Sequence, residues 1–452
     1  MHSKAHSHSF TFGFSWSPAN AALTILLTLL LLIFIFLFIF VTVEPAQGQT
    51  YTVLHNFTGG VDGAGPDAGL FMDNEGNLYG TTGGGGYTGG SCGTGGCGTV
   101  FKLSKKDSGW ILIPLYNFQG SDDGWCPEAV PTVGPDGNVY GTTTDGSPGG
   151  SPYSIGSHES DSTCNGYPCG TVYKLTPSAH ASPSAVGLWT HTVLHHFAGY
   201  PTDGNQPYHS PVTFSAEGSM YLTTYMGGTL GVGGGTVVRL MPSGSGWTES
   251  IIYSLGNGTY PVSGVIFDPS GNLYGTTLYG EGIYSNGTVF QLKPSGNGWT
   301  QNILHTFESG SDGGFPMGGL IFDPAGNLYG TTSGGNYPYP SPTVFEMTYG
   351  SWNLNTLYSF SPLDNSPIAG VARDAAGNLY GTAYNIGGGC GVVFKLTPGQ
   401  YGWTYTTLYD FPNGNLGCGP RGGVVVDANG NVYSTTSGGG THDAGVVFEI
   451  SP

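Results

Sequence analysis

Carboxylates recur at one spacing along this chain, each four residues ahead of a proline. The motif is Asp-Gly-x-x-Pro, and its carboxylates are Asp62, Asp123, Asp203 and Asp312, ahead of Pro66, Pro127, Pro207 and Pro316. Asn257 before Pro261 and Asp364 near Pro367 are variants. An Asp at the start of such a segment caps a turn with its own side chain. Alternatively, these side chains form a ring of carboxylates and amides that holds a cation or the hydroxyl groups of a sugar.

Two insertions are further candidates for ligand binding, because they interrupt an otherwise regular sequence. The longer insertion, 144–169, carries Tyr153, His158, Glu159 and Asp161. The shorter one spans residues 83–97. Function concentrates on loops that a rigid scaffold positions. The structural alternative is a Gly/Ser-rich loop held by a disulfide.

The chain carries no signature of a known catalytic chemistry. We find no HExxH motif, no P-loop and no dinucleotide fingerprint within a βαβ unit. His55, His195 and His305 stand where other repeats have tyrosine, which indicates packing with a polar tip rather than metal ligation. We therefore expect no catalytic residue, no metal and no cofactor.

All seven cysteines follow residue 49. Cys92 and Cys97 are spaced like Cys164 and Cys169, and each pair stands just before a Gly-Thr-Val segment. The predicted disulfides are Cys92–Cys97, Cys164–Cys169 and Cys390–Cys418, which leave Cys126 odd. The rival pairing is Cys97–Cys126. Disulfides are expected in proteins outside the cytoplasm.

The elements that must position these residues belong to a tandem repeat. The phrase GNLYGTT at Gly76–Thr82 returns six times with small changes, for example as GNVYSTT at Gly430–Thr436. Its second residue falls at Asn77, Asn138, Ser219, Asn272, Asn327, Asn378 and Asn431, which lie 61, 81, 53, 55, 51 and 53 residues apart. A period of about 50 is typical of a four-stranded propeller blade. The 82 Gly and 30 Pro argue against helical repeats.

Each repeat predicts four strands. In the unit near residue 319, GLIFDPAG and NLYGTTSGG form a hairpin, PTVFEM is the third strand, and WNLNTLYSF is the fourth. The Asp-x-x-Gly-Asn turn of the hairpin lacks the alternating carboxylates of a calcium loop, so we interpret it as turn chemistry. The tryptophans that open six of the fourth strands are interpreted as blade packing.

The two ends of the repeat region predict how the ring closes. Tyr51–Phe57 is a fourth strand with no preceding three, and Gly445–Ile450 is a third strand with no fourth after it. The first segment therefore completes the last blade, which removes an open sheet edge. We predict an all-β, seven-bladed propeller over residues 49–452, closed by its N-terminal strand and preceded by an apolar helix within residues 1–48.

The N-terminal segment and the charge limit the possible surroundings. Ala21–Val43 is an almost unbroken apolar run, which reads either as a membrane anchor or as a signal peptide cleaved before Gln49. Both alternatives export the remainder of the chain. With 10 Lys plus Arg against 28 Asp plus Glu, nucleic acid is an improbable partner. The membrane is a partner only if the apolar segment stays uncleaved.

The phrases GNLYGTT, GTVFKL and LYxF, with DGxxP between units, resemble the GloVer-type tandem repeat of exported bacterial proteins called choice-of-anchor proteins. The resemblance covers nearly everything from Tyr51 to Pro452 and implies export with some form of surface attachment. It implies no activity that can be assigned to residues here. The third unit, with GSMYLTT, and Pro342, where Gly is usual, depart from the pattern.

Two functional hypotheses follow. The first is a non-catalytic binding or adhesion module at the cell surface, for a polysaccharide or a surface protein. The second is an extracellular propeller enzyme of the lyase or lactonase type. In both, the ligand is expected on the face formed by the Asp loops and the insertions, near the mouth of the central channel.

Overall fold

The computed structural model describes residues 49–452 except 90–91, 107–108, 145–168, 179–188, 231–233, 245, 281–285, 297, 309, 335–340, 362–364, 386 and 413. The chain divides into two units, Met1–Gly48 and Gln49–Pro452. The apolar run and its expected helix lie outside the described residues. Within the described part, no helix is long and apolar enough to span a membrane.

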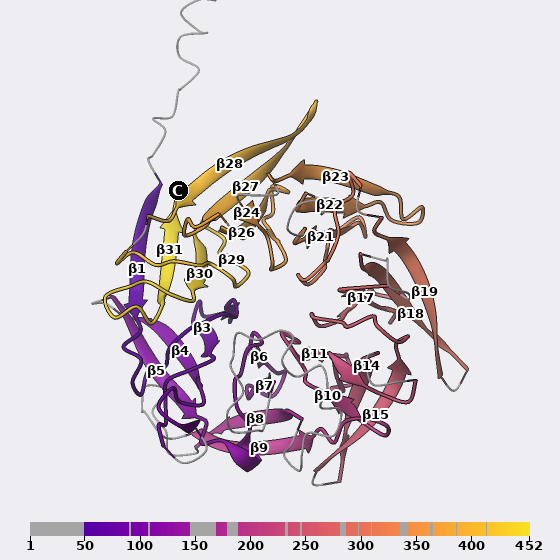
Figure 1. The fold of residues 1–452 in the computed structure, drawn as a ribbon, viewed down its shortest axis with the longest axis horizontal. Coiled ribbons are helices and arrows are strands. Elements are labelled where there is room, and N and C mark those ends of the chain that lie inside the picture. The colour runs from indigo at the N-terminus through magenta and orange to yellow at the C-terminus, as the bar shows by residue number, and fades with distance from the viewer. Residues whose placement is uncertain are drawn as a thin grey trace, which may run out of the picture. The chain divides into compact units, whose positions relative to one another are not determined.

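Seven antiparallel sheets of four strands, the blades, follow one another along the second unit (Figure 1). Blades 1 to 3 are β2–β5 (Phe71–Met72, Leu78–Thr82, Thr99–Lys106, Gly109–Asn117), β6–β9 (Thr132–Val133, Val139–Thr143, Thr171–Pro177, Trp189–His196) and β11, β12, β14, β15 (Thr213–Phe214, Met220–Thr224, Thr236–Ser243, Gly246–Ser254). Blades 4 and 5 are β16–β19 (Ile266–Phe267, Leu273–Thr277, Thr288–Ser295, Gly298–Thr306) and β20–β23 (Ile321–Phe322, Leu328–Thr332, Thr343–Met347, Leu354–Ser359). Blade 6 is β25–β28 (Ala372–Arg373, Leu379–Asn385, Val392–Gly399, Gly402–Asp410), and blade 7 is β29–β31 (Val425–Val426, Val432–Thr436, Val446–Ser451) with β1 (Thr50–Asn56).

Two short pairings add to these blades. β24 (Asn365–Ser366) pairs with the end of β26, and β10 (Gly204–Asn205) pairs with β13 (Met226–Gly227). The described part of the chain contains no α-helix. The prediction of an all-β propeller with seven four-stranded blades is therefore confirmed.

The second and third strands of each blade form the core. In blade 4, all five residues of β17 and the first five of β18 are buried. The outer strands β5, β9, β15, β19, β23 and β28 lie at the periphery in Figure 1, and most of their residues are half-buried or exposed. The blades therefore pack face to face, with each outer strand meeting both the next blade and solvent.

The repeated tryptophans pack between blades, as predicted. Five of the six stand at or just before the start of an outer strand and lie against the tyrosine of the second strand in the preceding blade. The ring centroids are 5.8 Å apart for Trp110 and Tyr433, 6.4 Å for Trp247 and Tyr140, 6.3 Å for Trp299 and Tyr221, 5.6 Å for Trp352 and Tyr274, and 6.4 Å for Trp403 and Tyr329.

The Asp-x-x-Gly-Asn segments are turns, also as predicted. Asp73 accepts hydrogen bonds from the backbone N–H of Asn77 at 2.8 Å and from its side-chain amide at 2.8 Å. Gly76 has a φ of +78°, a backbone conformation that a glycine adopts at little cost. Asp268, Asp323, Asp374 and Asp427 make the same contacts with Asn272, Asn327, Asn378 and Asn431. The carboxylates are occupied by their own turns.

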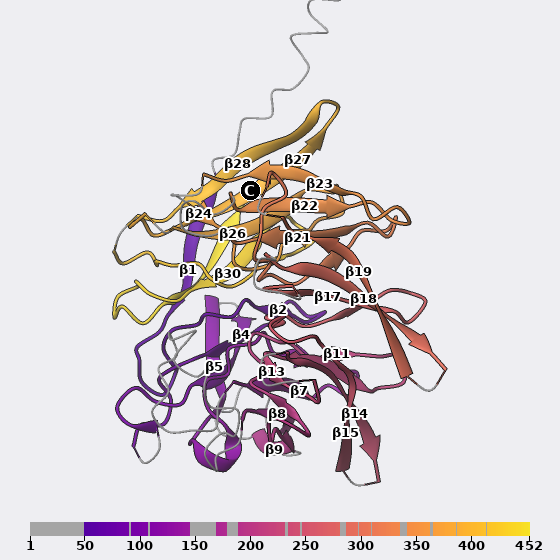
Figure 2. The same cartoon turned by 45° about the vertical axis from the view of Figure 1, so that its right-hand side comes forward.

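β1 is the outer strand of blade 7, although it comes from the opposite end of the described chain. It pairs antiparallel with β31 from Thr50 opposite Ser451 to Asn56 opposite Val446. Figures 1 and 2 both show the indigo β1 beside the yellow C-terminal strands. That this strand holds the ring closed stays a prediction.

Two of the predicted disulfides are present, Cys92–Cys97 and Cys390–Cys418. The rival pairing Cys97–Cys126 is wrong, because Cys97 bonds to Cys92. Cys169 is disulfide-bonded, while its predicted partner Cys164 lies outside the described residues. The Cys390–Cys418 bond joins the segment just before β27 in blade 6 to the loop that leads into blade 7.

Candidate functional site

A cavity of about 320 Å³ lies where the first strands of all seven blades converge. Its wall is built from the segments that lead into these strands, among them residues 67–70 of blade 1, 262–266 of blade 4 and 421–424 of blade 7. Pockets that bind small molecules have volumes of roughly 300–1,000 Å³. The cavity is therefore large enough for one small ligand or for the end of a chain-like one.

One position of the repeat varies in chemistry where it meets this cavity. It is the residue directly after the proline of each Asp-Gly-x-x-Pro segment or its variant, and after Pro420, which stands at the same place before blade 7. We call these seven residues the post-proline ring. In blade order they are Asp67, Glu128, Tyr208, Val262, Met317, Ile368 and Arg421, and all seven line the cavity. The repeat thus fixes where these side chains lie while leaving their identities free.

The post-proline ring is divided into a polar and an apolar side. Arg421, Asp67, Glu128 and Tyr208 come from blades 7, 1, 2 and 3, which are consecutive around the ring, and we call them the polar arc. Val262, Met317 and Ile368 come from blades 4, 5 and 6 and form the apolar arc. Such a cavity can offer hydrogen bonds to one side of a ligand and nonpolar contact to the other.

Asp67 and Arg421 form the centre of the polar arc. Asp67 is 9% exposed, and its Oδ1 lies 3.9 Å from Nε of Arg421 but accepts no hydrogen bond. Burial raises the pKa of the Asp67 carboxyl, while Arg421 and Ser437 lower it by less. The Arg421 guanidinium also lies over the ring of Tyr384, 4.8 Å from its centroid. A buried oxygen without a hydrogen bond is costly, so it favours a ligand donor.

Glu128, Tyr208 and His209 form the other half of the polar arc and its support. Glu128 is buried, and its Oε2 accepts a hydrogen bond from Oγ1 of Thr144 at 3.0 Å. The backbone carbonyl of Glu128 lies 2.8 Å from Nδ1 of His209, and the His209 ring meets the Tyr208 ring edge-on at 4.1 Å. These contacts join blades 2 and 3 and fix the direction in which Tyr208 faces the cavity.

His209 is neutral at pH 7. Burial lowers its pKa most, the hydrogen bond to Glu128 raises it, and Arg421 lowers it, so that the pKa is about 4. His209 is among the residues that line the cavity. A neutral imidazole can hold its Nδ1 proton on the Glu128 carbonyl and present Nε2 as an acceptor.

The low pKa of His209 predicts an acid-sensitive fold. Between about pH 6.5 and pH 4 the unfolded chain binds a proton at this position that the folded chain does not, so stability present above pH 6.5 is lost as the pH falls. The loss reaches up to about 3 kcal/mol. We expect His209→Asn to narrow the difference in unfolding free energy between pH 7.5 and pH 4.5, measured with urea. The exposed His442→Asn should leave this difference unchanged. Equal behaviour of the two variants would contradict the prediction.

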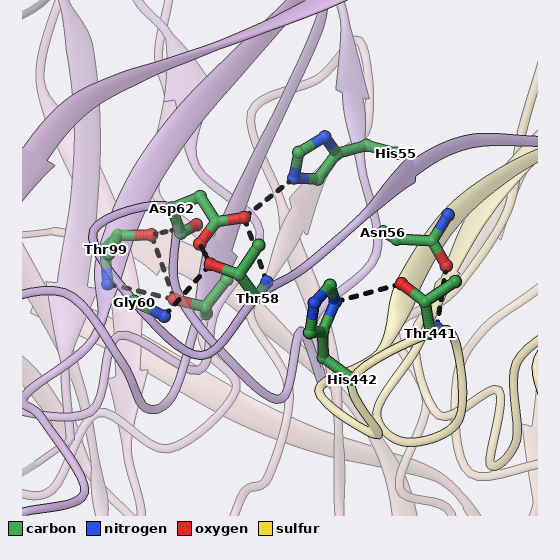
Figure 3. A network of polar contacts seen from close by, with 9 residues as sticks. His55, Asn56, Thr58, Gly60, Asp62, Thr99, Thr441 and His442 are labelled. Carbon is green, nitrogen blue, oxygen red and sulfur yellow. Dashed lines mark hydrogen bonds and ion pairs between the residues drawn. The ribbon is translucent and has the colours of Figure 1, made fainter.

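The four predicted carboxylates Asp62, Asp123, Asp203 and Asp312 cap the loops after the outer strands, and none is among the residues that line the cavity. Figure 3 shows His55 of β1 pointing at Asp62, with Nε2 and Oδ2 3.0 Å apart. Asp62 also accepts hydrogen bonds from the backbone N–H of Thr58 at 3.0 Å and from its hydroxyl. Burial raises the pKa of Asp62, but these hydrogen bonds outweigh it and leave the pKa lowered.

The other three repeat this arrangement. Asp203 and Asp312 lie 3.0 and 3.1 Å from Nε2 of His195 and His305, and Asp123 accepts from the Tyr116 hydroxyl at 2.9 Å. Burial raises the pKa of Asp123 more than its hydrogen bonds lower it. The carboxylates therefore make the contacts expected of turn caps. Ligand binding by them stays a prediction.

The remaining predicted residues, Asp364, Tyr153, His158, Glu159 and Asp161, lie outside the described residues. What sequence reasoning missed is the post-proline ring. Its signal was present: with the repeats aligned, the residue after the proline changes between acidic, basic, aromatic and aliphatic, whereas the proline itself recurs in every unit.

Several solved structures resemble the fold of this chain. The polysaccharide lyase Uly1 is 13% identical, with a TM-score of 0.48 over 86% of this chain and 90% of that one. A protein from Bacteroides fragilis NCTC 9343, provisionally assigned as a 6-phosphogluconolactonase, is 17% identical, with a TM-score of 0.48 over 81% and 88%. A gluconolactonase from Xanthomonas campestris is 11% identical, with a TM-score of 0.41 over 74% and 85%.

These identities are low, and the likeness concerns the fold alone. No curated protein matches the sequence. The model of the Gloeobacter/Verrucomicrobia repeat, in contrast, matches residues 147–385 and 300–452, and these two stretches together cover more than half of the chain. The tandem units built around GNLYGTT and GTVFKL therefore place this chain in the Gloeobacter/Verrucomicrobia repeat family.

Proposed function

We propose that this protein is a non-catalytic binding module that holds a carbohydrate in its central cavity. The observation that carries the proposal is the post-proline ring, where polar and apolar side chains occupy opposite sides of one cavity. A sugar ring presents hydroxyl groups at its edge and C–H groups on its faces. The polar arc offers carboxylate and phenol groups to the hydroxyls, and Tyr208 also offers a ring face.

The charges of the cavity favour a neutral sugar over an anionic one. The polar arc contains two carboxyl groups, Asp67 and Glu128, against the single guanidinium of Arg421. The whole chain has a formal net charge of −18, so it repels polyanions over a distance. Oδ1 of Asp67 accepts no hydrogen bond, and a sugar hydroxyl would supply the donor.

The proposal predicts that a screen of the 49–452 fragment on a glycan array finds at least one ligand. Asp67→Asn and Tyr208→Phe should each weaken binding of that ligand by about tenfold or more in calorimetry. Asp67→Asn replaces an acceptor oxygen with an amide donor, and Tyr208→Phe removes a hydroxyl group from the cavity. Asp410→Asn is the matched control, since Asp410 is exposed at the end of β28. If no glycan on the array binds, the proposal that the ligand is a carbohydrate is wrong. If both variants bind with full affinity, the binding site lies outside this cavity.

The alternative is a propeller enzyme of the lyase or lactonase type, and one observation favours it. The raised pKa of Asp67 makes this carboxyl a better proton donor near neutral pH than an exposed one, and it lines the same cavity as Glu128. Incubating the array ligand with the protein and weighing the products by mass spectrometry separates the two. If the wild-type protein converts the glycan and Asp67→Asn does not, the protein is an enzyme and not a binding module.

We propose further that the protein acts outside the cytoplasm, at the cell surface if its apolar segment stays uncleaved. The disulfides Cys92–Cys97 and Cys390–Cys418 support this, because they persist in oxidising compartments. The apolar run Ala21–Val43 supplies a means of export. In fractionated cells, external protease should reach the propeller, and a protected propeller in the cytoplasm would contradict the proposal.

A further inference from the structure

Neighbouring blades meet through a regular pairing of side chains along their outer strands. Residues of each outer strand are counted from the position of its tryptophan, which is one. The seventh residue of one blade then faces the third residue of the next blade, and we call each such facing pair a seam. A β-bulge lies just before the seventh residue in every blade, and bulges re-aim side chains.

In four seams the two facing residues contact each other directly, through stacked rings or a hydrogen bond. Three are stacked ring pairs, with centroids 4.3 Å apart for Tyr116 and His191, 4.3 Å for Tyr358 and Tyr405, and 3.9 Å for Tyr409 and Tyr51. In the fourth, the Tyr253 hydroxyl donates to Oε1 of Gln301 at 3.2 Å. The seam positions therefore serve packing or hydrogen bonding in most of the ring.

The other three seams carry histidine at the seventh position, each beside a loop carboxylate. His55 with Asp62 and His305 with Asp312 have leucine at the facing third position, Leu112 and Leu354. His195 with Asp203 has Glu249 instead. His195 Nε2, a carboxylate oxygen of Asp203 and one of Glu249 all lie within 4.8 Å of one another.

We infer that His195, Asp203 and Glu249 form a binding site for a divalent transition metal such as Zn²⁺, which joins blades 2 and 3 at the rim. Imidazole nitrogen and carboxylate oxygen are both ligands of Zn²⁺. With metal–ligand bonds of about 2.0–2.2 Å, neighbouring tetrahedral ligands stand about 3.3 Å apart. His195 Nε2 and Asp203 Oδ2 are 3.0 Å apart, which is close to that spacing.

The surroundings of the site show why a cation fits it. Oε1 of Glu249 is buried and accepts no hydrogen bond. Asp203 is 6% exposed and is held by backbone N–H groups, that of Ala198 at 2.9 Å and that of Gly204 at 2.6 Å. Burial and the nearby Asp203 raise the pKa of Glu249, His195 lowers it, and the result is a pKa of about 7. Two carboxylates brought together away from water repel each other, and a cation removes that repulsion.

The test is calorimetric titration of Zn²⁺ into the 49–452 fragment after treatment with a chelator. The fragment lacks His2, His6 and His8, whose imidazoles would bind metal independently. We expect one site per chain, weakened at least tenfold in Glu249→Leu, which copies the two leucine seams. Glu249→Gln keeps the shape of the side chain and should also weaken Zn²⁺ at least tenfold, so a folding defect cannot explain the loss.

The two leucine seams provide internal controls. His305→Tyr, which installs the residue that other blades use, should leave Zn²⁺ binding unchanged. Leu354→Glu should add a second site beside His305 and Asp312. Wild-type protein that binds no stoichiometric Zn²⁺, or Glu249 variants that bind it as tightly as wild type, would overturn the inference. Mg²⁺ in excess should not compete, because imidazole is a poor ligand for it.

Discussion

Removal of Gln49–Phe57 is expected to lower the melting temperature of the propeller by roughly 10 °C or more. The deletion takes away β1, which forms the outer strand of blade 7. It also removes Phe57, which is fully buried and whose ring centroid lies 5.2 Å from that of Phe101 in blade 1. Loss of a buried phenylalanine alone costs about 3–5 kcal/mol. The deletion also exposes the edge of β31, and exposed edges favour aggregation.

Thermal melting and size-exclusion chromatography measure these two effects. Thr50→Ala combined with Thr52→Ala is the matched control, because both side chains are exposed on the same strand and the backbone pairing stays. Exposed substitutions of this kind change stability by about 0.5 kcal/mol or less. A deletion variant that melts like this control would show that β1 does not hold the ring closed.

Gly422→Ala is expected to destabilise the fold by about 3 kcal/mol, because it forces two blades apart at the cavity wall. A Cβ atom on Gly422 of blade 7 would lie 2.5 Å from the backbone nitrogen of Gly69 and 2.6 Å from the carbonyl of Ala68, both in blade 1. Backbone atoms cannot rotate away as a side chain can. The substitution therefore acts where the first and last blades meet at the cavity wall.

The control for this prediction is Gly319→Ala, which lies on the same cavity wall in blade 5. A Cβ atom there meets nothing within 4 Å, so the stability should stay within about 0.5 kcal/mol of wild type. Urea unfolding monitored by tryptophan fluorescence compares the two variants. Equal stability of Gly422→Ala and Gly319→Ala would mean that the close backbone approach is not required.

The sequence predicts the architecture well because each local pattern, whether of a turn, a strand or a packing residue, recurs from repeat to repeat. Turn chemistry at Asp73, the packing of Trp110 and the strand pattern of GTVFKL each recur at fixed order, so a chance match is excluded. The orphan strand Tyr51–Phe57 likewise pointed to its partner at the other end of the chain. These inferences depend only on residues within one repeat or on the count of repeats.

The site was harder to predict because its residues meet only after the ring has formed. Asp67 and Arg421 are 354 positions apart in the sequence, yet their side chains are 3.9 Å apart. Asp62 was predicted to bind a ligand because it recurs in the repeat, whereas Asp67, five residues later, is the carboxylate that lines the cavity. Glu249 was overlooked for a similar reason: its partner His195 belongs to another blade, and only the seam geometry brings them together.

The central claim is that the cavity inside the post-proline ring is the binding site, and Gly319→Phe tests it most directly. Its side chain would enter open space in the cavity without meeting a neighbour near its Cβ. With the glycan found on the array as titrant, we predict near-native melting and an affinity reduced about a hundredfold, while Gly319→Ala binds like wild type. Wild-type affinity in a folded Gly319→Phe protein would contradict the account.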